Sequence, residues 1–293
     1  MSAAVRRSLA ALVVGLLLTL PALARAEPPV WRIHEPDGGE VVLFGSIHLL
    51  TPGLAWRSPA LDAALKGAGS LWFETPLDAE AAAAAQRTAL AKSALPQGQS
   101  LAALLSRTGR ERFARISAAL GLAPGALDQD QPWFAELVLT LRQLQTFGAD
   151  QGLGVEQTLM RAAPAAIPRG YFERPEEQVG FLADAPLQDQ LASLEENLQE
   201  MEADPDSFEE LERAWIGGDT AWIAREAILP LRAAAPGVYQ RMVVERNRRW
   251  TARIEDLLKR KERAFIVVGV GHLLGPDSVP AMLRRRGIRV EGP

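Results

Sequence analysis

Short segments with the length and patterning of β-strands cluster near both ends of the chain. They are residues 31–34, 41–44, 70–74, 264–268 and 288–290. The first two flank the turn-forming sequence Pro36-Asp37-Gly38-Gly39, and this order predicts a β-hairpin. The run at 264–268 is apolar without interruption, which is typical of a strand buried on both faces. We therefore expect strands from the two chain ends to form one sheet.

The middle of the chain has mostly helical patterning. Ser58 followed by Pro59 predicts a helix start, and Pro175 followed by two acidic residues predicts another. Further helices are expected over residues 79–94, 132–147, 154–163, 185–203, 208–216, 222–229, 238–261 and 278–286, with an extended piece at 168–172. No segment rich in Gly, Ser or Pro separates the helices. The expected fold is α/β (α+β), with a sheet from the N- and C-terminal strands and a large helical insertion.

The first 26 residues have the order of a secretory signal. Arg6 and Arg7 precede the apolar run 9–20, Pro21 follows, and Ala24-Arg25-Ala26 offers a cleavage site before Glu27. The apolar run is shorter than the roughly 20 residues that span a bilayer, although an uncleaved anchor is the alternative. We expect a signal peptide over 1–26 and a single domain over 27–293. A bacterial protein of this kind is periplasmic or secreted, without stable membrane insertion after cleavage.

Composition narrows the chemistry that this chain can carry. The 293 residues include no Cys, which excludes disulfides, thiolate metal sites and a Cys nucleophile. Lys and Arg number 32 against 36 Asp and Glu, so charge gives no reason to expect nucleic-acid binding. Only three His are present, and any imidazole site has few candidates. The acidic stretch 195–212 is expected to be a solvated helical surface.

Two of the three His occur in the same eight-residue pattern, G-x-x-H-L-L-x-P. It begins at Gly45 and again at Gly269, and it places His48 and His272 in loops that follow apolar strands. The carboxyl edge of such strands is where open α/β sheets bind ligands. Histidine is the commonest metal ligand and a frequent acid–base group. The alternative is two structural His at loop corners.

Glu74 ends the strand-like run 70–74 and is expected at the same sheet edge. Two His with one Glu form a known catalytic metal set that leaves a position open for water. A solvated strand-end carboxylate is the alternative for Glu74. Glu173 is either a general base, a fourth ligand or a helix N-cap. Arg246, with Asn247, either stabilises negative charge or lies on a solvated helix face.

These motifs resemble the TraB/GumN family, which includes the Tiki-type membrane proteases. The resemblance runs through nearly the whole mature chain and is carried by Gly45 to His48, Glu74, Gly154-Val155-Glu156, Phe172 to Gln178, Arg246-Asn247 and Gly269 to Gly275. The paired G-x-x-H motifs are its specific part. Glu156 stands where the family has Asp, and Phe172 is a second departure.

The resemblance implies a divalent-metal-dependent hydrolase, most simply a peptidase. His48, Glu74 and His272 would hold one ion of Mn, Co or Zn. Glu173 would act as general base, and Arg246 and Asn247 would stabilise developing negative charge. The partner expected is a peptide or another small substrate. The alternative is a non-enzymatic protein that binds a peptide, haem or polysaccharide in the same cleft.

Overall fold

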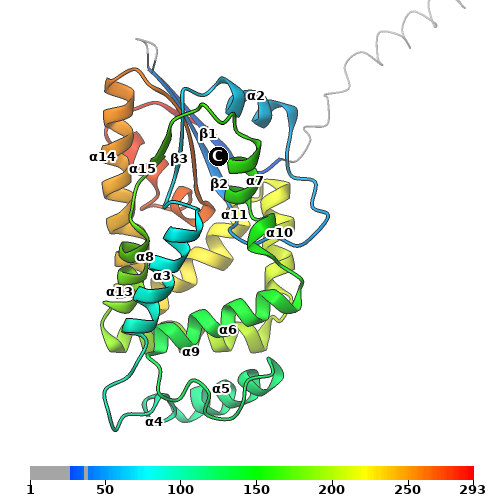
Figure 1. The fold of residues 1–293 in the computed structure, drawn as a ribbon, viewed down its shortest axis with the longest axis vertical. Helices are drawn as coiled ribbons and strands as arrows, with labels where there is room; N and C mark the ends of the chain where they lie inside the picture. The colour runs from blue at the N-terminus through cyan, green and yellow to red at the C-terminus, as the bar shows by residue number, and fades with distance from the viewer. Residues whose placement is uncertain (1–26, 36–38) are drawn as a thin grey trace, which may run out of the picture.

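Strands from the two ends of the chain pair in one six-stranded sheet. The computed structural model describes residues 27–35 and 39–293 (Figure 1). The strands are β1 (Val30–His34), β2 (Glu40–Ser46), β3 (Ser70–Phe73), β4 (Arg169–Tyr171), β5 (Arg263–Gly269) and β6 (Val290–Glu291). Their order across the sheet is β4-β3-β5-β2-β1-β6. The predicted α+β fold is confirmed. The turn at residues 36–38 and the predicted signal peptide lie outside the described residues.

Four neighbouring strands of the sheet are parallel. β3 pairs with β4 and with β5, and β5 pairs with β2, always in parallel, whereas β1 is antiparallel to β2 and to β6. Phe265, Ile266 and Val267 in β5 are fully buried, as the uninterrupted apolar run predicts. Because the four strands run the same way, their carboxyl ends lie along a single edge of the sheet.

Helices make up most of the remaining chain. They are α2 (Pro59–Gly67), α3 (Ala79–Lys92), α4 (Leu101–Leu104), α5 (Arg107–Ala119), α6 (Pro132–Thr146), α7 (Val155–Ala162), α8 (Pro175–Ala183), α9 (Leu187–Ala203), α10 (Ser207–Gly217), α11 (Thr220–Ile223), α12 (Leu229–Ala234), α13 (Pro236–Tyr239), α14 (Arg246–Lys259) and α15 (Val279–Arg285). The buried side chains of α2 and α14 belong, with those of the sheet, to the main apolar core. Figure 1 shows α4, α5, α6 and α9 at the end of the molecule away from the strands. α5 and α9, with part of α6, contribute to a second apolar core.

Local sequence signals explain several helix ends. The Ser58 hydroxyl accepts a hydrogen bond from the Leu61 amide, and Pro59 fills the first helical position of α2. The Ser278 hydroxyl caps α15 through the Ala281 amide in the same way.

Within the described residues, no helix is long and apolar enough to cross a membrane.

Two predicted helices contain π-helical segments. Residues 222–229 divide into α11 and the π segment η2 (Ala224–Ile228), and residues 238–261 include the π segment η3 (Gln240–Glu245) before α14. A π turn adds one residue to the helical repeat and is frequent at functional sites. η3 ends directly before Arg246, so it determines the direction in which this side chain leaves the helix.

Candidate functional site

Each parallel strand is followed, within three residues, by one of the candidate site residues. His48 follows β2, Glu74 follows β3, Glu173 follows β4 and His272 follows β5, where it lies in the short 3₁₀ helix η4 (Val270–Leu273). The topology therefore brings four residues that are distant in sequence to the carboxyl edge of one sheet. This is the edge at which open α/β sheets bind their ligands.

Gly269, the last residue of β5, marks the point where three of these side chains meet. A Cβ placed on Gly269 would lie 3.3 Å from Glu74 Oε1, 3.5 Å from His48 Nε2 and 3.6 Å from His272 Cδ2. The structure thus brings together the three residues that the sequence analysis groups as ligands. A side chain at position 269 would fill the space between them.

A cleft of about 250 Å³ opens beside this point. Its lining residues are His48, Phe73, Glu74, Thr75, Leu77, Gln151, Glu156, Gln157 and Gln178. The His48 side chain is 56% exposed, so solvent and a ligand reach it directly. Gln178 of α8 donates to Glu74 Oε2 at 2.9 Å with its Nε2 atom. The cleft therefore offers one imidazole, buried carboxylates and several amides.

The His48 imidazole is oriented by Glu156 of α7. His48 Nδ1 lies 2.7 Å from Glu156 Oε1, and the Ser46 hydroxyl donates to the same carboxylate oxygen. His48 Nε2 has no hydrogen-bond partner within the described part of the chain, and it faces Gly269. The Glu156 carboxylate raises the pKa of His48 to about 9, an effect that exposure of the ring to water weakens. Glu156 has no predicted role from the sequence, where its one signal is a loose match to the family's G-V-D motif.

Arg246, at the start of α14, connects the other candidates. Its Nε–H donates to Glu173 Oε1 at 2.9 Å. Nη1 lies 3.0 Å from His272 Nε2 and 3.2 Å from the Met242 carbonyl oxygen, while Nη2 donates to Glu74 Oε2 at 2.6 Å and to Glu173 Oε2 at 2.9 Å. All five guanidinium N–H groups are therefore used. The side chain is 3% exposed, so it lies inside the protein and not on a solvated helix face.

The Arg246 guanidinium sets the charge state of its neighbours. Burial raises the pKa of Glu74, but Arg246 and the two imidazoles outweigh it and lower that pKa to about 2. Burial together with Arg246 lowers the pKa of His272 to about 3. A neutral His272 agrees with its bonds, since Nδ1 lies 2.7 Å from Asn247 Oδ1 and Nε2 accepts from Arg246.

Glu173 and Asn247 have different places from those that the sequence analysis assigns to them. Glu173 is 1% exposed, and Arg246 and the Trp250 indole, at 2.9 Å from Oε1, occupy its oxygens. This leaves it no oxygen directed into the cleft for a general base, and it is not the N-cap of α8, which begins after Arg174. Asn247 is fully buried, and its Nδ2 donates to the carbonyl oxygens of His272 and Asp277. Both residues hold other side chains in place.

The donor groups do not fit a three-ligand metal centre as they are arranged. The His272 ring turns Cδ2 toward the shared point, because its Nε2 accepts from Arg246. Glu74 Oε1 accepts a hydrogen bond from the Gly269 amide at 2.7 Å, and Oε2 accepts hydrogen bonds from Arg246 and Gln178. Among the described residues, no three His, Asp or Glu side chains are placed to hold a metal ion. The His48–Glu74–His272 metal centre remains a prediction from sequence.

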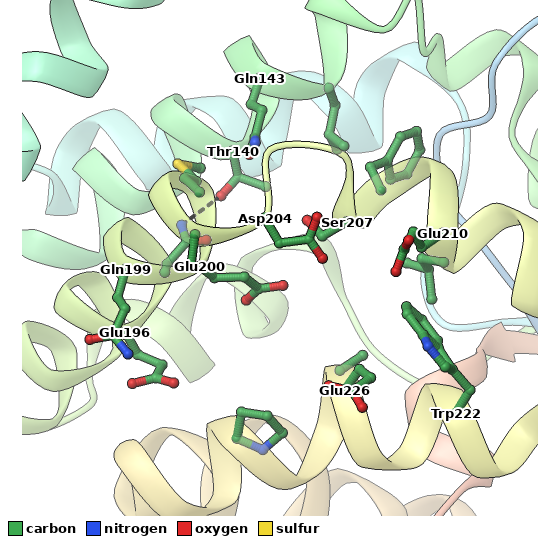
Figure 2. A pocket seen from close by; sticks show the side chains of 18 residues that line it. Thr140, Gln143, Glu196, Gln199, Glu200, Asp204, Ser207, Glu210, Trp222 and Glu226 are labelled. Carbon is green, nitrogen blue, oxygen red and sulfur yellow. Dashed lines mark hydrogen bonds between the residues drawn. The ribbon is translucent and has the colours of Figure 1, made fainter.

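A second, larger cavity of about 520 Å³ lies among the insertion helices and is acidic. Figure 2 shows its carboxylates on both sides of the opening. They are Glu196, Glu200, Asp204, Glu210 and Glu226, and no Lys or Arg occurs among its lining residues in the described chain. Burial and the neighbouring carboxylates raise the pKa of Glu200. Part of the acidic stretch 195–212 therefore lines a cavity and is not simply solvated surface.

Comparison with known proteins finds one family. The model of the TraB/PrgY/gumN family matches residues 29–292, which is nearly the whole chain. No curated protein matches the sequence. The matched residues include every side chain described above.

Proposed function

The chain belongs to the TraB/PrgY/gumN family, and on this premise we propose that its cleft is the active site of a hydrolase that cleaves amide bonds of peptides. The proposal rests on the bonding of the two ring nitrogens of His48. Its Nδ1 is fixed by Glu156, and its Nε2 is open to the cleft. An imidazole held at one nitrogen by a carboxylate and free at the other is suited to general base catalysis in its neutral form, so turnover should rise with pH through the raised pKa of His48.

In this mechanism, His48 activates a water molecule in the cleft. Nε2 takes a proton from the water while the water oxygen bonds to the carbonyl carbon of the substrate. The proton then passes from Nε2 to the amide nitrogen, the C–N bond breaks, and the amine leaves. Glu156 stabilises the imidazolium that forms between the two steps. Gln178 uses one N–H on Glu74 and has a second for the negative charge on the carbonyl oxygen.

The exported location is a further part of the proposal. It rests on the order of residues 1–26, in which two Arg precede an apolar run and an A-x-A site. The mature chain would begin at Glu27 and act in the periplasm or outside the cell. Mass spectrometry of the protein from a bacterial host tests this, because an intact N-terminus in the membrane fraction contradicts it.

Turnover of a fluorogenic peptide library by chain 27–293 tests the hydrolase. His48→Ala should lower kcat by about 10²-fold or more, as expected for a lost general base. His34→Ala is the matched control, since His34 lies on β1 outside either G-x-x-H motif and should leave turnover unchanged. If the protein binds peptides, a glycan or haem without turnover, the binding-protein alternative replaces the hydrolase. Haem would give a Soret band.

A further inference from the structure

We infer that Arg246 is the resident cation of this site and takes the place that the resemblance would give to a divalent metal. The inference concerns which cation occupies the site and does not depend on the hydrolase proposal. It starts from the position of the guanidinium. Arg246 bonds directly to Glu74, Glu173 and His272, two of which are predicted metal ligands.

The donor atoms of the predicted metal ligands are already in use. A catalytic metal site needs about three protein ligands with free lone pairs. His272 offers one such lone pair, on Nε2, and a guanidinium N–H at 3.0 Å occupies it. Glu74 Oε2 accepts from Arg246 and Gln178. The arginine therefore makes the contacts that a metal ion would make.

The charges of the site also favour the guanidinium. Glu74 and Glu173 are buried carboxylates, 7% and 1% exposed, and a buried charge is costly unless it is paired. The guanidinium supplies one positive charge, which Glu74 and Glu173 share. A divalent ion bound against His272 would lie beside a guanidinium that is itself buried, and the two cations would repel each other.

Two aromatic rings also hold the Arg246 guanidinium in its position. Its guanidinium carbon lies 4.8 Å from the centre of the Trp250 ring and 5.3 Å from that of Phe181. Aromatic faces of this kind attract the cation and limit its movement. To free His272 for a metal, the guanidinium must leave these rings or keep an N–H unpaired inside the protein, which is unfavourable.

The three imidazoles of the chain allow a direct test. We label the histidines of chain 27–293 with ¹⁵N, record their ring nitrogens by NMR, and add Zn²⁺, Mn²⁺ or Co²⁺ after dialysis against chelator. The expected result is that His272 keeps its neutral Nδ1–H tautomer and that its signals do not move with Zn²⁺. Elemental analysis of the purified protein before the chelator dialysis should find only trace metal. One tightly held equivalent of metal that His272→Ala removes would overturn the inference.

Two variants separate the guanidinium from general charge effects. Arg246→Met removes the cation from His272, and we expect divalent metal to bind about tenfold more tightly or better, through His272. Arg249→Met is the matched control. Arg249 also lies on α14, 3.5 Å from Glu173 and 4.9 Å from Phe181, but it is 52% exposed, and its loss should leave metal binding unchanged.

Unchanged metal affinity in a folded Arg246→Met would contradict the inference. If this variant does not fold, the wild-type NMR and elemental measurements still decide. Activity enters neither measurement, so a failed hydrolase proposal and a failed inference about Arg246 are distinguished.

Discussion

His48 Nδ1 lies 2.7 Å from Glu156 Oε1, although 108 positions separate the two residues. The backbone brings them together. The Val155 amide donates to the Ile47 carbonyl at 3.1 Å, which places the start of α7 against the loop after β2. The carboxylate at the second position of α7 then reaches the imidazole. The pair is therefore a feature of tertiary structure, formed where the start of α7 contacts the loop after β2.

Glu156→Gln should lower the pKa of His48 from about 9 toward its ordinary value of 6.5. Glutamine keeps an oxygen for Nδ1–H but removes the charge that favours the imidazolium. Because the base is the neutral ring, the acid limb of the activity profile should move to lower pH. NMR titration of the ring measures the pKa. Glu212→Gln is the control, since Glu212 holds Thr51 in the same loop and does not contact His48. An unmoved pKa would contradict the assignment.

Sequence patterns predicted the strands and the doubled His motif because these signals are local. The site network is not local. The segment that contains Arg246 has the composition of a charged surface helix, but η3 shifts the helical register just before it, and the side chain points inward. α5 is not among the predicted helices, because its apolar face toward the second core is short: Phe113 is buried and Ile116 is partly buried, among many charged residues. The role of Glu156 could not be predicted from sequence, because it depends on the contact between two distant segments of the chain.

Gly154→Ala should displace the His48 loop. A Cβ at position 154 would lie 1.9 Å from the His48 carbonyl oxygen, so the backbone of one segment must move. Overpacking of this kind costs about 1–3 kcal/mol, measurable as a lower urea midpoint. Turnover should fall as well, because the imidazole moves with its loop. Gly217→Ala in α10 meets no atom within 4 Å and should not destabilise the protein. Equal stability of the two variants would exclude the predicted contact.

Glu200→Gln should stabilise the protein above neutral pH. Partial burial of the carboxyl group and repulsion from Glu196, Asp204 and Glu226 raise the pKa of Glu200 in the folded protein, although Glu200 as a whole is exposed and water screens part of this repulsion. A carboxyl group with a raised folded pKa favours folding at low pH, and this contribution is lost as pH rises through that pKa. The increase in the free energy of unfolding should therefore be largest at pH 8 and small below pH 4.5. It should also be smaller at high salt. Urea unfolding at both pH values tests this, and a gain that is independent of pH would contradict it.

Glu74→Gln tests the energetic role of the buried network. The Glu74 carboxylate joins Gly269 at the end of β5, Gln178 of α8 and Arg246 of α14. Its pKa is about 2 in the folded protein against an ordinary 4.5, chiefly because Arg246 outweighs the cost of burial. The stabilisation that this implies is complete above pH 4.5 and is lost as pH falls toward 2.

The difference in pKa corresponds to about 3 kcal/mol at pH 7, and Glu74→Gln should lose an amount of that order. The loss should shrink when unfolding is repeated between pH 4 and pH 3, because the unfolded wild-type chain then takes up a proton at position 74, whereas the folded protein, in which the pKa of Glu74 is about 2, does not. Glu40→Gln removes a more exposed pair with Arg263 at 3.2 Å, and by contrast should change stability little. A small, pH-independent loss for Glu74→Gln would mean that burial and attraction cancel. The Arg246 network would then orient the site without stabilising the fold.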